Sequence, residues 1–291
     1  MPRIARRGRP RGAGLGKLPP ISNPQSISGV ADWVEFYIAY YQQSLAKTAL
    51  AGHLERNSGS EGSFDLDGIW SELERRRLLY GSKAPYKIFR GYVESTLKWE
   101  DSPEYLSCIL WALRGNPTQT TRTGKLFERL SGEAARRYLE GDLIIYGHPS
   151  KQKITTIADT LSEKFAEKPA ARFNDRGVDL IVWKKFKDDR CGQVILLAQC
   201  ASGHNWKSKI GTLPYDSWGY YIHWGCKPLK AFTTPVVISD DEMYDLSTQA
   251  GLLFDRTRIY KNVINKKIND SSLREDLLAW CRLTIPKFVN S

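Results

Sequence analysis

Two apolar runs of strand length stand in the second half of this chain, Gly177-Val178-Asp179-Leu180-Ile181-Val182-Trp183 and Val194-Ile195-Leu196-Leu197-Ala198-Gln199-Cys200-Ala201. A polar segment, residues 184–192, joins them, and this order predicts two adjacent antiparallel strands. Because the chain reverses between the runs, we expect Asp179 and Gln199 to lie close together at one edge of a sheet. Carboxylate and amide oxygens are typical ligands of a hard divalent cation, so this edge is a candidate metal site.

The segments around these runs alternate between helical and strand patterns. Such alternation predicts a mixed α/β sheet flanked by helices in residues 119–291. Gly141 follows the first of these helices and is expected to be its C′ glycine. The expected helices are 124–139, 151–167, 240–250 and 272–285, and the expected further strands are 143–146, 232–239 and 252–254.

The first part of the chain has a different composition. Residues 1–28 carry six basic residues among glycine and proline, which predicts a flexible basic arm able to follow a phosphate backbone. Residues 29–118 predict a helical domain, because apolar residues recur at spacings of three and four. The expected helices are 30–51, 67–80, 85–94 and 103–114.

The chain has 291 residues, a formal net charge of +11 and a pI of about 9.4. This surplus favours a polyanionic partner, of which nucleic acid is the commonest. The five cysteines are odd in number and fit no zinc spacing, which indicates reduced thiols in a cytoplasmic protein. No apolar run is long enough to cross a bilayer, so we expect no membrane partner.

Three short motifs, taken in order, resemble the PD-(D/E)XK nucleases of the restriction-endonuclease-like fold, within their Mrr-like branch. They are Gly124-Lys125-Leu126-Phe127-Glu128 in the first predicted core helix, Gly177-Val178-Asp179 and Gln199-Cys200-Ala201 in the two strands. The resemblance covers residues 120–265, and the helical N-terminal half resembles no family that we can name. It implies a nuclease domain over residues 119–291.

The resemblance also implies a set of metal ligands. Asp179 would be the central ligand of Mg²⁺ or Mn²⁺, Gln199 would supply a neutral oxygen, and the backbone carbonyl of Cys200 would complete the set. A glutamate would join them directly or through water. Glu128 is the first candidate, and Glu163, on the helix before the Asp179 strand, is the alternative.

One residue departs from the family pattern, because Ala201 stands where the motif has a lysine. The family's lysine can move to a neighbouring helix, so we expect Lys209 or Lys207 to replace it and to lower the pKa of the attacking water. Arg256 and Arg258 are candidate phosphate contacts on the far side of the sheet.

These observations lead to a metal-dependent DNA endonuclease as the first hypothesis, with restriction or anti-phage defence as the setting that the resemblance implies. The second hypothesis is a nucleic-acid-binding subunit with a degraded catalytic site. A third is a subunit that is active only with other defence proteins or as a homodimer.

Overall fold

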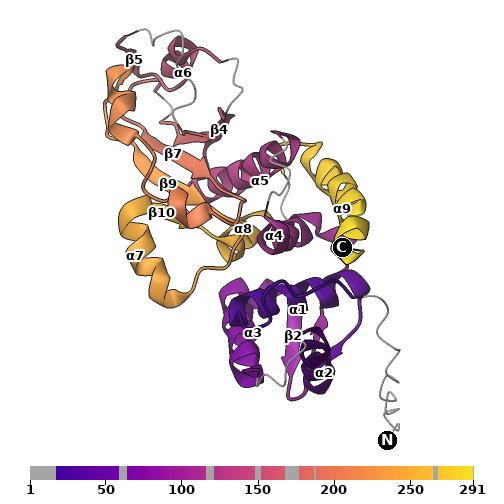
Figure 1. The fold of residues 1–291 in the computed structure, drawn as a ribbon. Helices are drawn as coiled ribbons and strands as arrows, with labels where there is room; N and C mark the ends of the chain where they lie inside the picture. The colour runs from indigo at the N-terminus through magenta and orange to yellow at the C-terminus, as the bar shows by residue number, and fades with distance from the viewer. Residues whose placement is uncertain are drawn as a thin grey trace, which may run out of the picture.

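The computed structural model describes residues 18–58, 64–115, 121–147, 152–167, 177–186, 188–264 and 268–290. Most of the predicted basic arm, residues 1–17, lies outside this description. The described part is a mixed α/β protein in which a mainly helical N-terminal half lies to one side of a five-stranded sheet, with α4, α8 and α9 between them (Figure 1).

The large sheet has the order β10-β9-β7-β6-β4. Strand β6 is antiparallel to both of its neighbours, whereas β7, β9 and β10 run parallel to one another. Leu180 lies opposite Ala198, which confirms the predicted antiparallel pairing of the two apolar runs. The strands are β4 (Asp142–Ile145), β6 (Leu180–Lys184), β7 (Val194–Cys200), β9 (Leu229–Thr233) and β10 (Leu252–Phe254).

Helices cover both faces of this sheet. Alternation along β6 places Leu180 and Val182 under α5 (Thr121–Leu139), α8 (Arg256–Val263) and α9 (Leu273–Val289). Ile181 and Trp183 face the opposite layer. That layer contains α6 (Ile154–Thr160), α7 (Asp240–Ala250), the short helices η3 (Trp206–Lys209) and η4 (Tyr215–Tyr220), and a ribbon of β5 (Lys164–Phe165) with β8 (Ile222–His223).

Helix α5 positions the first motif against the sheet. Its apolar side, which includes Phe127 and Leu130, is buried on β4, β6 and β7. The helix ends at Leu139, and Glu140 takes the left-handed conformation of a C′ residue with φ of 53°, so the prediction that Gly141 is the C′ residue was wrong. Gly141 is required for another reason, because a Cβ there would lie 2.1 Å from the carbonyl oxygen of Trp183.

The N-terminal half contains a small sheet as well as helices. The predicted helix over residues 85–94 was wrong, because this segment is a hairpin in which Phe89 pairs with Tyr92 across a turn at Arg90 and Gly91. The segment from 151 to 167 is also less helical than predicted. The N-terminal elements are α1 (Ile27–Tyr41), β1 (Leu45–Ala46), α2 (Lys47–Ser58), α3 (Leu66–Tyr80), η1 (Gly81–Lys83), β2 (Tyr86–Phe89), β3 (Tyr92–Ser95), η2 (Trp99–Asp101) and α4 (Pro103–Arg114).

The two halves share their cores. Tyr260 of α8 and Phe288 of α9 are buried with α1, α3 and α4, and Trp111 of α4 is buried with α5. The C-terminal end of α9 accordingly lies beside α1 (Figure 1). The C-terminal helices therefore complete the core of the N-terminal half, and the sheet is anchored to that half through apolar packing.

Candidate active site

Asp179 lies directly before β6, where β4, β6 and β7 meet. Its amide donates to the carbonyl of Ala198 (2.9 Å), and its Oδ2 accepts from the amide of Cys200 (2.7 Å). Its carbonyl accepts from two successive amides, those of Tyr146 (2.7 Å) and Gly147 (3.0 Å), which is the two-for-one pairing of a β-bulge. The side chain is thus fixed by the neighbouring strand, and Gly147 is brought alongside it.

Glu128 extends from α5 to the same place. The point that a Cβ would occupy at Gly147 is 2.7 Å from Glu128 Oε2 and 2.9 Å from Asp179 Oδ1. The two carboxylates therefore converge on the space left by the missing side chain. Two of the predicted metal ligands, contributed by α5 and by the start of β6, are brought together in the structure.

Lys125 completes this cluster and was not predicted as a site residue. Its ammonium group donates to Glu128 Oε2 (2.8 Å) and to the carbonyl of Gly147. The side chains are partly exposed, 29% for Lys125 and 13% for Glu128, so solvent or a ligand can reach them. The sequence signal was the spacing i, i+3, which puts Lys125 and Glu128 on one face of a helix.

The two lysines predicted to replace the missing one belong to η3, which packs in the layer opposite α5. Lys207 forms an ion pair with Glu242 of α7. Lys209 is exposed, and its carbonyl accepts a hydrogen bond from the hydroxyl of Thr212 (2.7 Å). The same hydroxyl lies 3.4 Å from Gln199 Oε1, so η3 lies beside Gln199.

Gln199 and Cys200 face different layers. The Cys200 thiol lies toward α5, where burial raises its pKa well above the usual value and the negative charges of Asp179 and Glu128 raise it further. Cys200 therefore stays a neutral thiol. Because successive strand residues point to opposite faces, the Gln199 side chain points to the other layer, where it lines a small hollow with Lys230. This places Gln199 on the opposite face of β7 from Glu128.

Glu163 is placed apart from Asp179. Its Oε1 accepts from the amide of Gly192 (3.0 Å) and its Oε2 from the amide of Gly225 (2.7 Å), and the residue is only 6% exposed. Gly192 precedes β7, whereas Cys200 ends that strand. Glu163 thus joins two loops at the opposite end of β7 from the Asp179 contact.

The two predicted phosphate contacts differ in exposure. Arg256 is completely buried and bound by Asp32 and Glu35, so it cannot contact DNA in this structure and that prediction was wrong. Arg258 is exposed, although its guanidinium donates to the carbonyl of Leu253 (2.7 Å). Arg258 stays a candidate phosphate contact.

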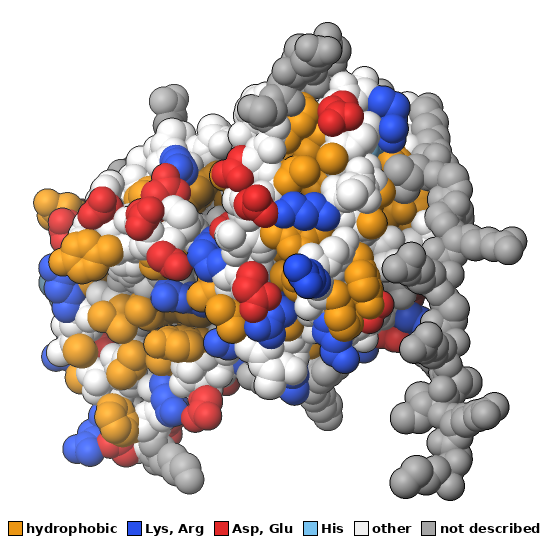
Figure 2. Space-filling model, turned by 90° about the horizontal axis from the view of Figure 1, so that it is seen from below, with side chains coloured by type: hydrophobic (Ala, Val, Ile, Leu, Met, Phe, Trp, Pro, Cys, Tyr) orange, Lys and Arg blue, Asp and Glu red, His pale blue; other side chains and the backbone are white. Residues whose placement is uncertain are grey.

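Positive charge is dispersed on the face of the molecule that is seen from below. Lys and Arg side chains there lie among acidic and apolar ones (Figure 2). Among the described residues, no group of three or more His, Cys, Asp or Glu side chains is arranged to hold a metal ion. No described helix is both long enough and apolar enough to span a membrane.

Comparison with known proteins adds no further constraint, because no family model, curated protein or solved structure matches this chain.

Proposed function

We propose that this chain is a metal-dependent phosphodiester hydrolase that acts on DNA as an endonuclease, in restriction or anti-phage defence. The observation that carries the proposal is the convergence of Glu128 and Asp179 at Gly147, with Lys125 bound to Glu128. The resemblance of the three sequence motifs to PD-(D/E)XK nucleases supports the same chemistry. Two carboxylates and a lysine at a partly exposed strand end suit catalysis at a phosphate.

The residues present fit Mg²⁺ or Mn²⁺. Magnesium is usually held by one or two carboxylates, with water and substrate phosphate oxygens in its other positions. Glu128 and Asp179 supply two carboxylates, whose oxygens lie 2.7 and 2.9 Å from the point that a Cβ of Gly147 would occupy. With no third acidic, His or Cys ligand grouped there among the described residues, the remaining positions would be left to water and substrate.

Lys125, Glu128 and Asp179 would each have a distinct role in the reaction. Asp179 would be the primary ligand, because the Cys200 amide holds its Oδ2 while its Oδ1 lies toward Gly147. Glu128 would be the second ligand, and its bond with Lys125 would keep the ammonium group beside the phosphate. Lys125 would stabilise negative charge as it develops on the phosphate. The metal, when bound, supplies a Lewis acid that lowers the pKa of water.

The charge of the chain supports a nucleic-acid substrate. Residues 1–17 contain six basic and no acidic residues, which is more than half of the net charge of +11. A basic segment of this kind would bind phosphates without reading sequence. DNA binding should therefore weaken steeply as salt concentration rises.

Cleavage of supercoiled plasmid by the purified full chain tests the proposal. We expect nicking with Mg²⁺ or Mn²⁺ and none with EDTA. Asp179→Asn and Glu128→Gln should each lower the rate by about 100-fold or more, because each removes a charge from the metal site. The matched control is Asp142→Asn, on the exposed side of β4, which should cleave like the wild type.

A specific observation favours the rival function, a nucleic-acid-binding subunit without catalysis. Ala201, which stands in place of the family's lysine, is buried among Trp206, Ile210 and Phe232, so no basic side chain occupies that position. The rival predicts salt-sensitive DNA binding, no cleavage with either metal, and no effect of Asp179→Asn. Cleavage that appears only when other defence proteins are added would instead identify a subunit that needs its partners.

A further inference from the structure

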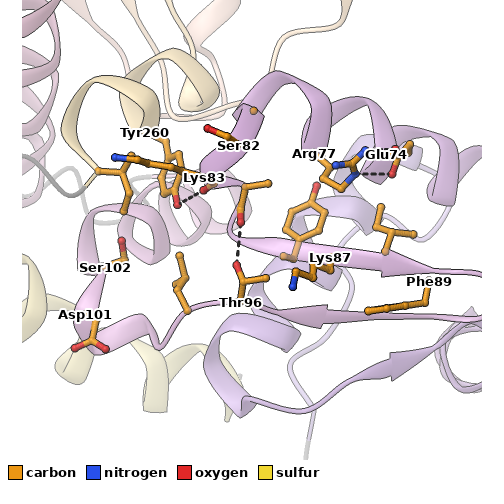
Figure 3. Close-up of a pocket in the computed structure, with 16 residues that line it drawn as sticks. Glu74, Arg77, Ser82, Lys83, Lys87, Phe89, Thr96, Asp101, Ser102 and Tyr260 are labelled. Atoms are coloured by element: carbon orange, nitrogen blue, oxygen red, sulfur yellow. Dashed lines mark hydrogen bonds and ion pairs between the residues drawn. The ribbon is translucent and has the colours of Figure 1, made fainter.

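A cavity lies in the N-terminal half, and neither Glu128 nor Asp179 lines it. Its volume is about 630 Å³, within the range of cavities that bind small organic ligands. It is bounded by the end of α3, the turn η1, strand β2, the loop before α4, and α8 (Figure 3). Its walls therefore come from both halves of the sequence.

The cavity offers cations that are not already neutralised. Arg77 is bound to Glu74 in a two-pronged ion pair, with Nε 2.8 Å from Oε2. Lys83 and Lys87, by contrast, form no ion pair within the described part of the chain. They come from the turn and from β2, respectively, and lie toward different parts of the cavity (Figure 3). An anionic ligand would therefore find two available ammonium groups.

A buried hydroxyl in the same wall lacks a partner. Ser102 is 1% exposed and occupies the N-cap position of α4, but its Oγ makes no capping bond and no other hydrogen bond to the described residues. Buried polar groups are nearly always satisfied, since an unmade bond costs free energy. A ligand oxygen bound in the cavity could accept or donate a hydrogen bond at this hydroxyl.

Two further residues of the cavity lining indicate which kind of anionic ligand would fit. Phe89 is 39% exposed and stacks on Tyr92, with ring centroids 4.6 Å apart, so a flat ring could extend the stack. Asp101 lies at the other end of the cavity (Figure 3). A carboxylate repels a bare phosphate but accepts hydrogen bonds from hydroxyl or amino groups. A nucleotide has all three kinds of group, namely phosphate, aromatic base and sugar hydroxyls.

We propose that this cavity binds a phosphorylated nucleotide as a small-molecule ligand. Lys83 and Lys87 form ion pairs with its phosphates, and the base stacks on Phe89. Ser102 and Asp101 form hydrogen bonds with its polar groups. Tyr260 of α8 also lines the cavity, and its hydroxyl donates to the carbonyl of Lys83 (2.8 Å). The bound ligand would thus contact both the N-terminal half and the helix that packs against α5. The proposal does not depend on nuclease activity.

Isothermal titration calorimetry on the full chain at physiological salt tests this inference. The probes are ATP, GTP, a cyclic dinucleotide, pyrophosphate and a short single-stranded oligonucleotide. We expect at least one of the free nucleotides to bind saturably and more tightly than pyrophosphate, and to raise Tm. If no nucleotide binds with Kd below about 1 mM, or if only the oligonucleotide binds, the proposal is overturned.

Substitutions of the lining residues test whether the nucleotide binds in this cavity. Lys83→Gln combined with Lys87→Gln should weaken nucleotide binding by about tenfold or more, because each lysine supplies a charge-assisted hydrogen bond. Ser102→Ala should weaken it by a few fold without lowering Tm, because the hydroxyl has no partner in the protein. Lys261→Gln, an exposed residue of α8 outside the cavity, is the charge-matched control. A double variant that keeps both its Tm and its affinity would place the ligand elsewhere.

Discussion

Two clusters of opposite charges in this protein differ in how completely their members are enclosed. In the junction cluster, Asp32 and Glu35 of α1 bind Arg76 of α3 and Arg256 of α8, and both arginines and Glu35 are 0% exposed. The Tyr80 hydroxyl donates a hydrogen bond to Glu35 and accepts one from Nε of Arg256. Every one of these charges is paired inside the protein.

The strand-end cluster of Lys125, Glu128 and Asp179 is only partly enclosed. Glu128 Oε2 and Asp179 Oδ1 both lie beside Gly147, and the Glu128 carboxylate is bound by the partly exposed Lys125. The comparison teaches that charge alone does not identify a functional site. A cluster whose charges are paired and buried fixes the packing of helices, whereas carboxylates that converge at a partly exposed strand end can bind a ligand.

The largest expected effect is on stability, at the junction cluster. Arg256→Met should lower the free energy of unfolding by about 3–5 kcal/mol, because it leaves buried carboxylates with fewer partners. Arg258→Met, two residues along α8 and exposed, should change it by less than about 0.5 kcal/mol. Urea unfolding measures the stability of both variants. Equal losses of stability would contradict the assignment of a structural role to Arg256.

A smaller effect is expected on catalysis, at the strand-end cluster. Lys125→Met should lower plasmid cleavage by about 10- to 100-fold with little change in Tm, because it removes a positive charge beside the phosphate. Lys207→Met, which removes a surface ion pair with Glu242 and the ammonium group over the Trp206 ring, is the matched control. Full activity in Lys125→Met together with a loss in Lys209→Met would restore the assignment made from sequence.

The smallest effect concerns acid stability. Burial alone would raise the pKa of Asp32, but the guanidinium groups of Arg256 and Arg76 hold it below its usual value. Its contribution to stability is therefore present above the unfolded pKa of about 3.9 and is lost as the pH falls through the lower folded value. Asp32→Asn should be less stable at neutral pH, and its stability should depend less on pH below about pH 4. Thermal unfolding from neutral to acid pH measures this, and parallel profiles would contradict it.

The sequence was informative where a structure depends on local pattern. Strands β6 and β7 and helix α5 follow from alternation, helical periodicity and chain reversal, whereas the meeting of Asp179 with Glu128 was expected only from the family resemblance. The role of Arg256 could not be read this way, because its partner Asp32 is 224 positions away in the sequence. The sequence pattern of a charged side chain near a strand end is the same whether that side chain binds a ligand or forms a buried ion pair.

Two other differences between the predictions from sequence and the structure have local causes. The hairpin at residues 86–95 replaces the predicted helix because Arg90 and Gly91 form a turn between two short strands. Lys125 precedes Glu128 by three residues in α5, whereas the predicted lysines follow Ala201 in the chain. A residue one helical turn before Glu128 reaches the same space only because α5 packs across the strand end.

The most direct test of the central claim is the rate of Mg²⁺-dependent plasmid nicking by Gly147→Ala. The added methyl group would lie within 2.9 Å of both carboxylates, and it can be accommodated only if those side-chain ends move apart. Gly124→Ala on α5, where a Cβ meets nothing within 4 Å, is the control. If Glu128 and Asp179 hold the metal, Gly147→Ala keeps its Tm and loses nicking by about 100-fold, while Gly124→Ala retains it. Equal nicking by the wild type and both variants would contradict the account.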